Sequence, residues 1–118
     1  MTDTIRMKNE YEIDAISQVV TIKIVSKTYG TFYTKIDLAD FPEVSNHIWG
    51  VHRHRAKFYA ATKTFELQNF LCQPGPGMVS DHIDRDPLNN LRSNLRVVTA
   101  RKNMHNRTDL RQGYAVYS

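Results

Sequence analysis

Apolar and polar residues alternate along the first part of the chain, which is the pattern of β-strands with one buried face. The alternation covers residues 20–25 and residues 31–36, and a turn-like stretch with a glycine separates the two runs. Two such runs joined by about five residues predict a β-hairpin. Residues 11–14 predict an additional strand at the edge of the same sheet.

The pattern changes after residue 36, where acidic residues and a proline predict short helical turns. Asp37 is expected to cap a turn that runs to Asp40, because an aspartate side chain accepts hydrogen bonds from the first amides of a helix. Pro42 is expected to begin a second turn, since the fixed φ of proline suits the first helical position.

Apolar residues return between positions 48 and 72, where they predict a second pair of strands. Ile48, Trp49 and Val51 predict one strand, and residues 57–61 predict its partner across a polar loop. Residues 64–72 are compatible with either a strand or a short helix, because their hydrophobic period is ambiguous.

Two prolines and two glycines within five residues predict a loop at residues 73–77. We expect this loop to be a hinge between two parts of the chain. The predicted organisation is an N-terminal β-rich subdomain (1–72), the hinge (73–77), a C-terminal catalytic or binding unit (78–109) and a tail (110–118).

The C-terminal unit is predicted to contain two strands and a helix. Residues 78–82 suit a short strand, and residues 95–99 suit its antiparallel partner. Thr99 is expected to cap a helix over residues 100–107, which contain good helix formers and neither glycine nor proline. Such a small unit requires support from the N-terminal half or from a bound metal.

The composition narrows the class of protein. A chain of 118 residues is one domain by length, and it is too small to enclose a large pocket for a small-molecule cofactor. There is no run of 18 apolar residues and no apolar signal segment, so no membrane partner is expected. The lone Cys72 has no partner for an internal disulfide, which favours a cytoplasmic protein.

Residues 80–107 concentrate the groups that phosphodiester hydrolysis requires: a base, a cation and donors that fix the phosphate. Histidine is the usual base near neutral pH, and oxygen ligands suit Mg²⁺. Asp81 and His82 are neighbours in a predicted strand, so their side chains point to opposite faces. We expect Asp81 to face a metal and His82 to face an attacking water. Asn103, on the predicted helix, is a candidate for the second ligand.

The pattern "DHID…LNN…SNLRVVT…N…NR" resembles the HNH endonucleases, in particular the phage and intron-encoded branch in which asparagine replaces the third histidine. The spacing supports this resemblance, because His82 and Asn94 are 12 residues apart and Asn94 and Asn103 are 9 apart. The resemblance implies a ββα-metal finger. The expected fold class is therefore α+β, with an N-terminal antiparallel β subdomain followed by that finger.

The resemblance also implies the role of each site residue. Asp81 and Asn103 would hold one divalent ion, Mg²⁺ or Mn²⁺, and His82 would be the general base. Asn94 would hold the loop by hydrogen bonds and so orient His82. The implied activity is nicking or cutting of double-stranded DNA by a phage or prophage enzyme related to homing endonucleases. Low sequence specificity and a monomer or weak dimer are expected.

His105 is the alternative histidine, and helix geometry argues against it. Two residues along a helix correspond to a rotation of about 200°, so Asn103 and His105 face nearly opposite ways. The family spacing selects Asn103.

The net charge of +4 favours contact with nucleic acid only slightly. Basic and polar residues near the predicted site are expected to contact the phosphate backbone, which gives affinity with little sequence information. These candidate DNA-binding residues are Arg53, Arg55, Lys57, Arg92, Arg96, Arg101, Lys102, Asn106 and Arg107.

Two alternatives to an active nuclease remain open. Residues 67–69 read Leu-Gln-Asn where related small phage proteins usually carry Leu-His-Arg, so the chain is alternatively a catalytically silent DNA-binding or packaging accessory that keeps the finger. A structural zinc module is less favoured, because zinc prefers cysteine and histidine ligands and only one cysteine is present.

Overall fold

The computed structural model describes residues 7–101 of the chain. Its N-terminal sheet contains three consecutive antiparallel strands: β1 (Tyr11–Asp14), β2 (Val19–Ser26) and β3 (Gly30–Asp37). The predicted hairpin and edge strand are confirmed. Val20, Ile22 and Ile24 are fully buried, so the alternation seen in the sequence places one face of β2 against the core.

A fourth strand joins this sheet from the far end of the chain. β7 (Asn89–Asn90) pairs with β3 in parallel, and its register places Asn90 opposite Ile36. No alternation in the sequence marks this two-residue strand, because its pairing depends on a partner more than 50 residues away. The strand attaches the C-terminal part of the chain to the N-terminal sheet.

Two short helical turns follow β3 at the predicted positions. The 3₁₀ turn η1 (Leu38–Asp40) is followed by α1 (Phe41–Val44), which has Pro42 in its first turn. The predicted cap by the side chain of Asp37 is wrong, since that side chain makes no cap hydrogen bond. The amide of Leu38 instead donates to the backbone carbonyl of Gln18 at 2.8 Å.

The strands β4 (Gly50–His54) and β5 (Lys57–Ala61) form a separate two-stranded ribbon. β4 begins at Gly50 and not at Ile48 as predicted, because the side chain of Asn9 takes both backbone polar groups of Trp49. Asn9 accepts from the Trp49 amide at 2.9 Å and donates to the Trp49 carbonyl at 2.8 Å. The predicted polar loop is also shorter, because strand pairing extends to His54 and Lys57.

The ambiguous segment 64–72 contains a helix, α2 (Leu67–Cys72). Leu67 and Leu71 bury one side of this helix in the core. The helix ends where Gln73 adopts a left-handed conformation with φ of 48°. Residues 73–77 contain neither helix nor strand, so the predicted loop is confirmed.

The C-terminal hairpin has the two predicted strands, β6 (Met78–His82) and β8 (Leu95–Thr99), in antiparallel register. A 3₁₀ turn, η2 (Arg92–Asn94), precedes β8. Ala100 and Arg101 have helical conformation after Thr99. The rest of the predicted helix, and the tail, lie outside the described residues.

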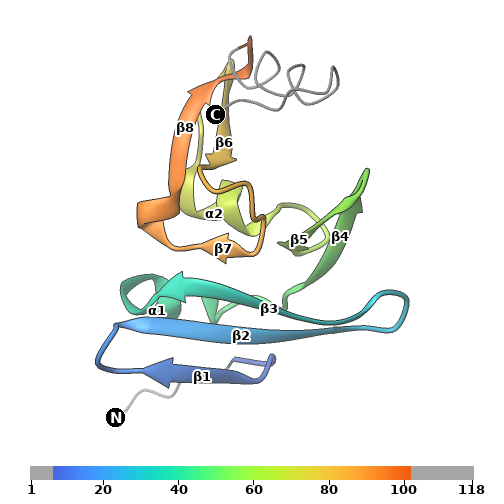
Figure 1. Ribbon diagram of the computed structural model, residues 1–118, viewed down its shortest axis with the longest axis vertical. Coiled ribbons are helices and arrows are strands. Elements are labelled where there is room, and N and C mark those ends of the chain that lie inside the picture. The colour runs from blue at the N-terminus through green and yellow to red at the C-terminus, as the bar shows by residue number, and fades with distance from the viewer. Residues whose placement is uncertain (1–6, 102–118) are drawn as a thin grey trace.

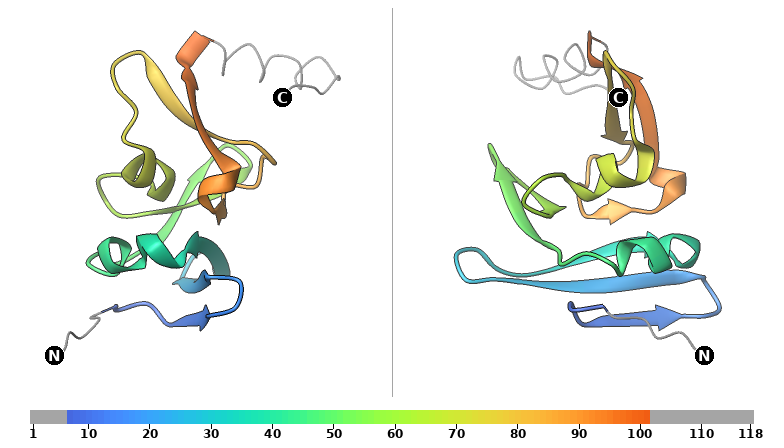
Figure 2. Two further views of the ribbon diagram at one scale, coloured as in Figure 1. Left: turned by 90° about the vertical axis from the view of Figure 1, so that its left-hand side faces the viewer. Right: turned by 180° about the vertical axis from the view of Figure 1, so that it is seen from behind.

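The elements form a mixed α+β structure that consists mostly of strands, so the predicted class is confirmed at this level. Figures 1 and 2 show the N-terminal sheet as one layer, with the β4–β5 ribbon and the β6–β8 hairpin both standing on the same side of it. Helix α2 lies between them. The buried core between these parts contains Val20, Ile22, Ile24, Ile36, Phe41, Val44, Trp49, Ala60, Leu67 and Leu71.

Residues 7–101 contain no helix with the length and apolar character needed to cross a membrane.

Candidate active site

Asp81 and His82 are the last two residues of strand β6. Asp81 lies opposite Arg96 of β8, and His82 lies opposite Leu95. Because consecutive residues of a strand point to opposite faces, the two side chains have different surroundings. His82 is only 7% exposed, whereas the side chain of Asp81 is 22% exposed.

The imidazole of His82 is held by a chain of polar side chains that reaches the N-terminal sheet. Its Nε2 lies 2.8 Å from Oδ1 of Asn90. The amide nitrogen of Asn90 donates to Thr34 Oγ1 at 2.9 Å and to the carbonyl of Pro87 at 3.2 Å. The hydroxyl of Thr34 donates in turn to the carbonyl of Leu88 at 2.7 Å. Asn90 and Thr34 are both fully buried, so these bonds are shielded from competing water.

This arrangement selects one tautomer of His82. The carbonyl of Pro87 can only accept, so the nitrogen of the Asn90 amide must point to it and the Asn90 oxygen must point to His82. An amide oxygen also only accepts, so Nε2 of His82 carries the proton. In the neutral ring the lone pair is then on Nδ1. Within residues 7–101, Nδ1 makes no hydrogen bond.

Burial lowers the pKa of His82 below its usual value of 6.5. The hydrogen bond to Asn90 and the negative charges of Asp81, Asp84 and Asp86 act in the opposite direction, but they do not cancel the effect of burial. The neutral ring is therefore favoured at pH 7, which is the state that a general base requires.

Asn94 closes the loop that follows β6. Its side-chain oxygen accepts from the amide of Asp84 at 3.0 Å, and its side-chain nitrogen donates to the Asp84 carboxylate and to the Asn89 carbonyl, each at 2.9 Å. Its backbone carbonyl accepts from the amide of Ile83 at 2.8 Å. One asparagine thus ties both ends of the loop together directly beside His82.

Asp84 shows how polar this loop is. Burial raises the pKa of its carboxyl, but hydrogen bonds from the Asp86 amide, Asn89 and Asn94 outweigh that effect and hold the pKa below its usual value. The ionised carboxylate therefore acts as an acceptor around which the loop is organised.

The carboxylate of Asp81 is paired with Arg96 on the neighbouring strand. Nη2 and Nε of Arg96 lie 2.8 Å and 2.9 Å from the same oxygen, Oδ2. Arg96 therefore holds the Asp81 side chain on the face of the hairpin opposite to His82.

The donor set agrees in part with a Mg²⁺ or Mn²⁺ ion. Such ions are bound through one or two oxygen ligands, with waters and substrate phosphate completing the shell. Asp81 supplies one suitable carboxylate, and the predicted second ligand, Asn103, lies outside the described residues. Among residues 7–101 there is no cluster of three or more histidine, cysteine or acidic side chains that could hold a metal by itself.

The predicted DNA-binding residues occupy different environments. Arg53, Arg55 and Lys57 are exposed on the β4–β5 ribbon. Arg92 forms a two-bond ion pair with Asp40, at 2.9 Å and 3.0 Å, that joins η2 to η1. The others are Arg96, which pairs with Asp81, Arg101, which is exposed, and Lys102, Asn106 and Arg107, which lie outside the described residues together with His105.

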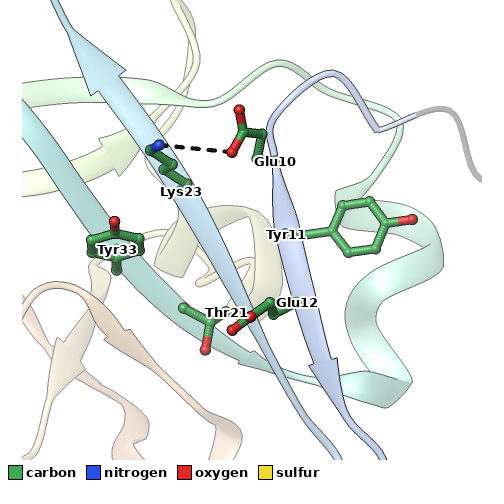
Figure 3. Close-up of a pocket in the computed structure, with 6 residues that line it drawn as sticks. All are labelled: Glu10, Tyr11, Glu12, Thr21, Lys23 and Tyr33. Atoms are coloured by element: carbon green, nitrogen blue, oxygen red, sulfur yellow. Dashed lines mark ion pairs between the residues drawn. The ribbon is translucent and has the colours of Figure 1, made fainter.

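A shallow hollow of about 290 Å³ lies on the face of the N-terminal sheet that points away from the core (Figure 3). Thr21, Lys23 and Tyr33 line it, and Lys23 pairs with Glu10 at 3.7 Å. These strand residues alternate with the buried Ile22 and Thr34, so the hollow faces away from His82.

Sequence reasoning did not single out three residues beside His82. Asn90 and Thr34 hold its Nε2 side, and the ring centroid of Tyr59 lies 6.2 Å from its own. Asn90 is part of the "NN" in the quoted motif, but the motif does not show which of its asparagines is buried. Thr34 and Tyr59 come from other elements, and no spacing rule connects them to His82.

Residues 74–105 match the model of a family described as HNH endonuclease. The segment contains Asp81, His82, Asn90 and Asn94, so the predicted resemblance to the HNH endonucleases is confirmed over the part of the chain that carries the site. The match covers about a quarter of the chain and indicates a nuclease-type function with a nucleic acid substrate. HNH nucleases generally use a divalent metal. No curated protein and no solved structure matches the chain.

Proposed function

We propose that the protein is a divalent-metal-dependent DNA endonuclease of phage or prophage type, which nicks or cuts double-stranded DNA with low sequence specificity. In this proposal residues 78–109 form a ββα-metal finger, residues 1–72 support it and contact DNA, and residues 73–77 connect the two.

The observation that carries the proposal is the fixed orientation of His82. Because Asn90 Oδ1 accepts a hydrogen bond from Nε2–H, Nδ1 is left as the basic atom of a neutral ring. A general base requires this state, and the buried bonds from Asn90 to Thr34 keep it in place. Nδ1 then takes the proton of the water that attacks phosphorus.

The other motif residues have supporting roles in this mechanism. Asn94 keeps the loop closed, and thereby keeps Asn90 beside His82. Asp81 and Asn103 would hold the metal. When bound, a divalent ion neutralises the charge that develops on the phosphate and on the leaving oxygen.

The test is plasmid nicking by purified protein with Mg²⁺ or Mn²⁺ over a range of salt. The wild-type protein is expected to nick, and His82→Ala to lose about 10²–10⁴-fold in rate, which is the usual contribution of a general base. His105→Ala is the matched control, because the family spacing selects Asn103 as the site residue in place of that histidine. Thermal melting of each variant separates a lost base from a lost fold.

Arg96 favours a second candidate, a DNA-binding accessory without turnover. Arg96 pairs with Oδ2 of Asp81, and a metal would have to bind the same carboxylate. This candidate predicts that wild-type protein binds DNA in a salt-sensitive manner but leaves plasmid intact, and that His82→Ala binds equally well. Intact plasmid at every metal and salt condition would exclude the nuclease proposal.

A further inference from the structure

The two faces of the β4–β5 ribbon carry different side chains. The register pairs His52 with Tyr59 and His54 with Lys57, and residues that lie opposite each other in a sheet share a face. We call the face that carries His52, His54, Lys57 and Tyr59 the site face. The intervening pair, Arg53 and Phe58, points to the other face.

The site face touches the candidate active site at two points. The ring of Tyr59 lies beside that of His82, with centroids 6.2 Å apart. Farther along the ribbon, Nζ of Lys57 donates to the carbonyl of Arg85 at 2.8 Å, in the loop that follows β6. These contacts fix the ribbon relative to His82, and Figure 1 shows its free end projecting away from the N-terminal sheet.

The other face of the ribbon is partly covered by the β2–β3 hairpin. Phe58 packs against Tyr29 and Phe32, with ring centroids 5.0 Å apart in each case. Ala60, farther along the same face, is fully buried in the core. Phe58 and Ala60 are therefore covered, Arg53 stays exposed on this face, and the face that contacts His82 is the site face.

The exposed groups of the site face suit a phosphate backbone. Lys57 and His54 are exposed at its outer end, while His52 is paired with Glu66 at 2.6 Å. Lysine, histidine and tyrosine donate hydrogen bonds to phosphate oxygens without reading base sequence. His54 and Lys57 lie at the tip of the ribbon, and Tyr59 lies between them and the proposed general base, His82.

We propose that the site face binds the sugar-phosphate backbone of duplex DNA beside the scissile phosphate, through His54 and Lys57, and that the Tyr59 hydroxyl positions the phosphate next to His82. The proposal rests on the proposed nuclease function for its substrate. A base acts on water about 3 Å away, and the water must be within similar reach of phosphorus. The ring adjacent to His82 is therefore placed to meet the same or the neighbouring phosphate.

Binding is tested first, without metal, so that the result does not depend on cleavage. Fluorescence anisotropy of a labelled duplex in EDTA compares wild type, His54→Ala, Lys57→Ala and the double variant. Lys57 carries the charge that displaces a counterion from DNA, so Lys57→Ala and the double variant are each expected to reduce the steepness of log K against log salt by about 0.9. His54→Ala removes a hydrogen-bond donor and is expected to weaken binding with a smaller change in this slope. Lys27→Ala, which removes an exposed lysine from the tip of the β2–β3 hairpin, is the matched control and should keep the wild-type slope.

The role of Tyr59 is tested by nicking kinetics of Tyr59→Phe, which keeps the ring against His82 and removes only the hydroxyl. We expect kcat to fall about tenfold or more, with unchanged melting temperature and an unchanged pH profile, because the base itself is intact.

The outcomes separate this inference from the proposed function. Suppose that wild type nicks DNA but the double variant keeps the wild-type salt slope, or that Arg53→Ala weakens binding more than the double variant does. Binding by the site face is then wrong and the nuclease proposal stands. If wild type fails to nick but the double variant shows the reduced salt slope, the nuclease is wrong and the binding face stands. Wild-type kcat in Tyr59→Phe would remove Tyr59 from the proposal.

Discussion

The buried residues of strand β2 are Val20, Ile22 and Ile24, whereas the buried polar residues of the segment that carries the site are His82, Asn90 and Asn94. The first set is held by removal of apolar surface from water, which is not directional. The second set is held by hydrogen bonds, which are directional and lose most of their value when one partner is missing. The N-terminal sheet therefore provides stability, and the loop provides a defined geometry for one imidazole.

The two regions are joined where β7 pairs with β3. Thr34 belongs to β3 but donates to the carbonyl of Leu88 and accepts from Asn90, both in the segment between β6 and β8. The orientation of His82 thus depends on a residue of the other region. The comparison predicts that damage to the sheet reduces stability, while damage to the loop reduces activity more than stability.

The largest expected effect on stability comes from the sheet. Ile22→Ala should reduce the free energy of unfolding by about 2–5 kcal/mol, because it removes buried methyl groups and leaves a cavity. Chemical denaturation measures this change. The fraction that stays folded should nick DNA at the wild-type rate; a slower folded fraction would show that the regions are not separable in this way.

Asn94→Ala should have a smaller effect on stability and a large one on activity. The change leaves the Asp84 amide, the Asp84 carboxylate and the Asn89 carbonyl without their bonds to this side chain. Leaving such groups without a hydrogen-bond partner lowers the free energy of unfolding by about 1–3 kcal/mol. We expect kcat for nicking to fall at least tenfold while DNA affinity stays the same. Equal losses in stability for Asn94→Ala and Ile22→Ala would contradict the comparison.

Thr34→Val tests the connection between the regions. Valine keeps the shape of threonine but removes the hydroxyl, so Asn90 loses one of its two acceptors. We expect a loss of about 1 kcal/mol in unfolding free energy and a fall in kcat with unchanged KM. Thr21→Val, on the outer face of the same sheet, is the control and should change neither. A KM effect without a kcat effect would show that Thr34 does not act through His82.

The smallest effect concerns pH, in the metal-free protein. Burial lowers the pKa of His82 in the folded state, so above pH 6.5 its neutral ring contributes fully to stability. As pH falls below 6.5, the unfolded chain takes up a proton first and stability is lost until the folded pKa is passed. Denaturation in EDTA between pH 7.5 and pH 5 should show this loss, and His82→Gln should lose less over the same range. Equal slopes would mean that His82 is not buried as a neutral ring.

Local patterns predicted most of the strands. β1, β5, β6 and β8 have the predicted bounds, and β2 and β3 extend one residue beyond theirs at each end. Period-two alternation encodes these elements in a few neighbouring residues. The errors occur where a distant group intervenes: Asn9 delays β4 by binding Trp49, and Gln18 replaces Asp37 as the partner of the Leu38 amide.

The motif spacing identified part of the site in the same local way. Asp81 and His82 lie on the predicted strand, and Asn94 lies in the loop that it closes. Asn90 was passed over because several asparagines occur in the loop, and spacing alone does not show which of them is buried.

The sequence by itself determined the strands, the loop at residues 73–77 and the resemblance to HNH endonucleases, because each depends on residue types at fixed short distances along the chain. Only the tertiary structure decided what surrounds His82. Thr34 of β3, Tyr59 of β5 and Asn90 of β7 are brought together by strand pairing and core packing across more than 50 residues. The tautomer and the lowered pKa of the imidazole follow from that packing, since burial and hydrogen-bond direction are properties of the folded environment and not of the motif.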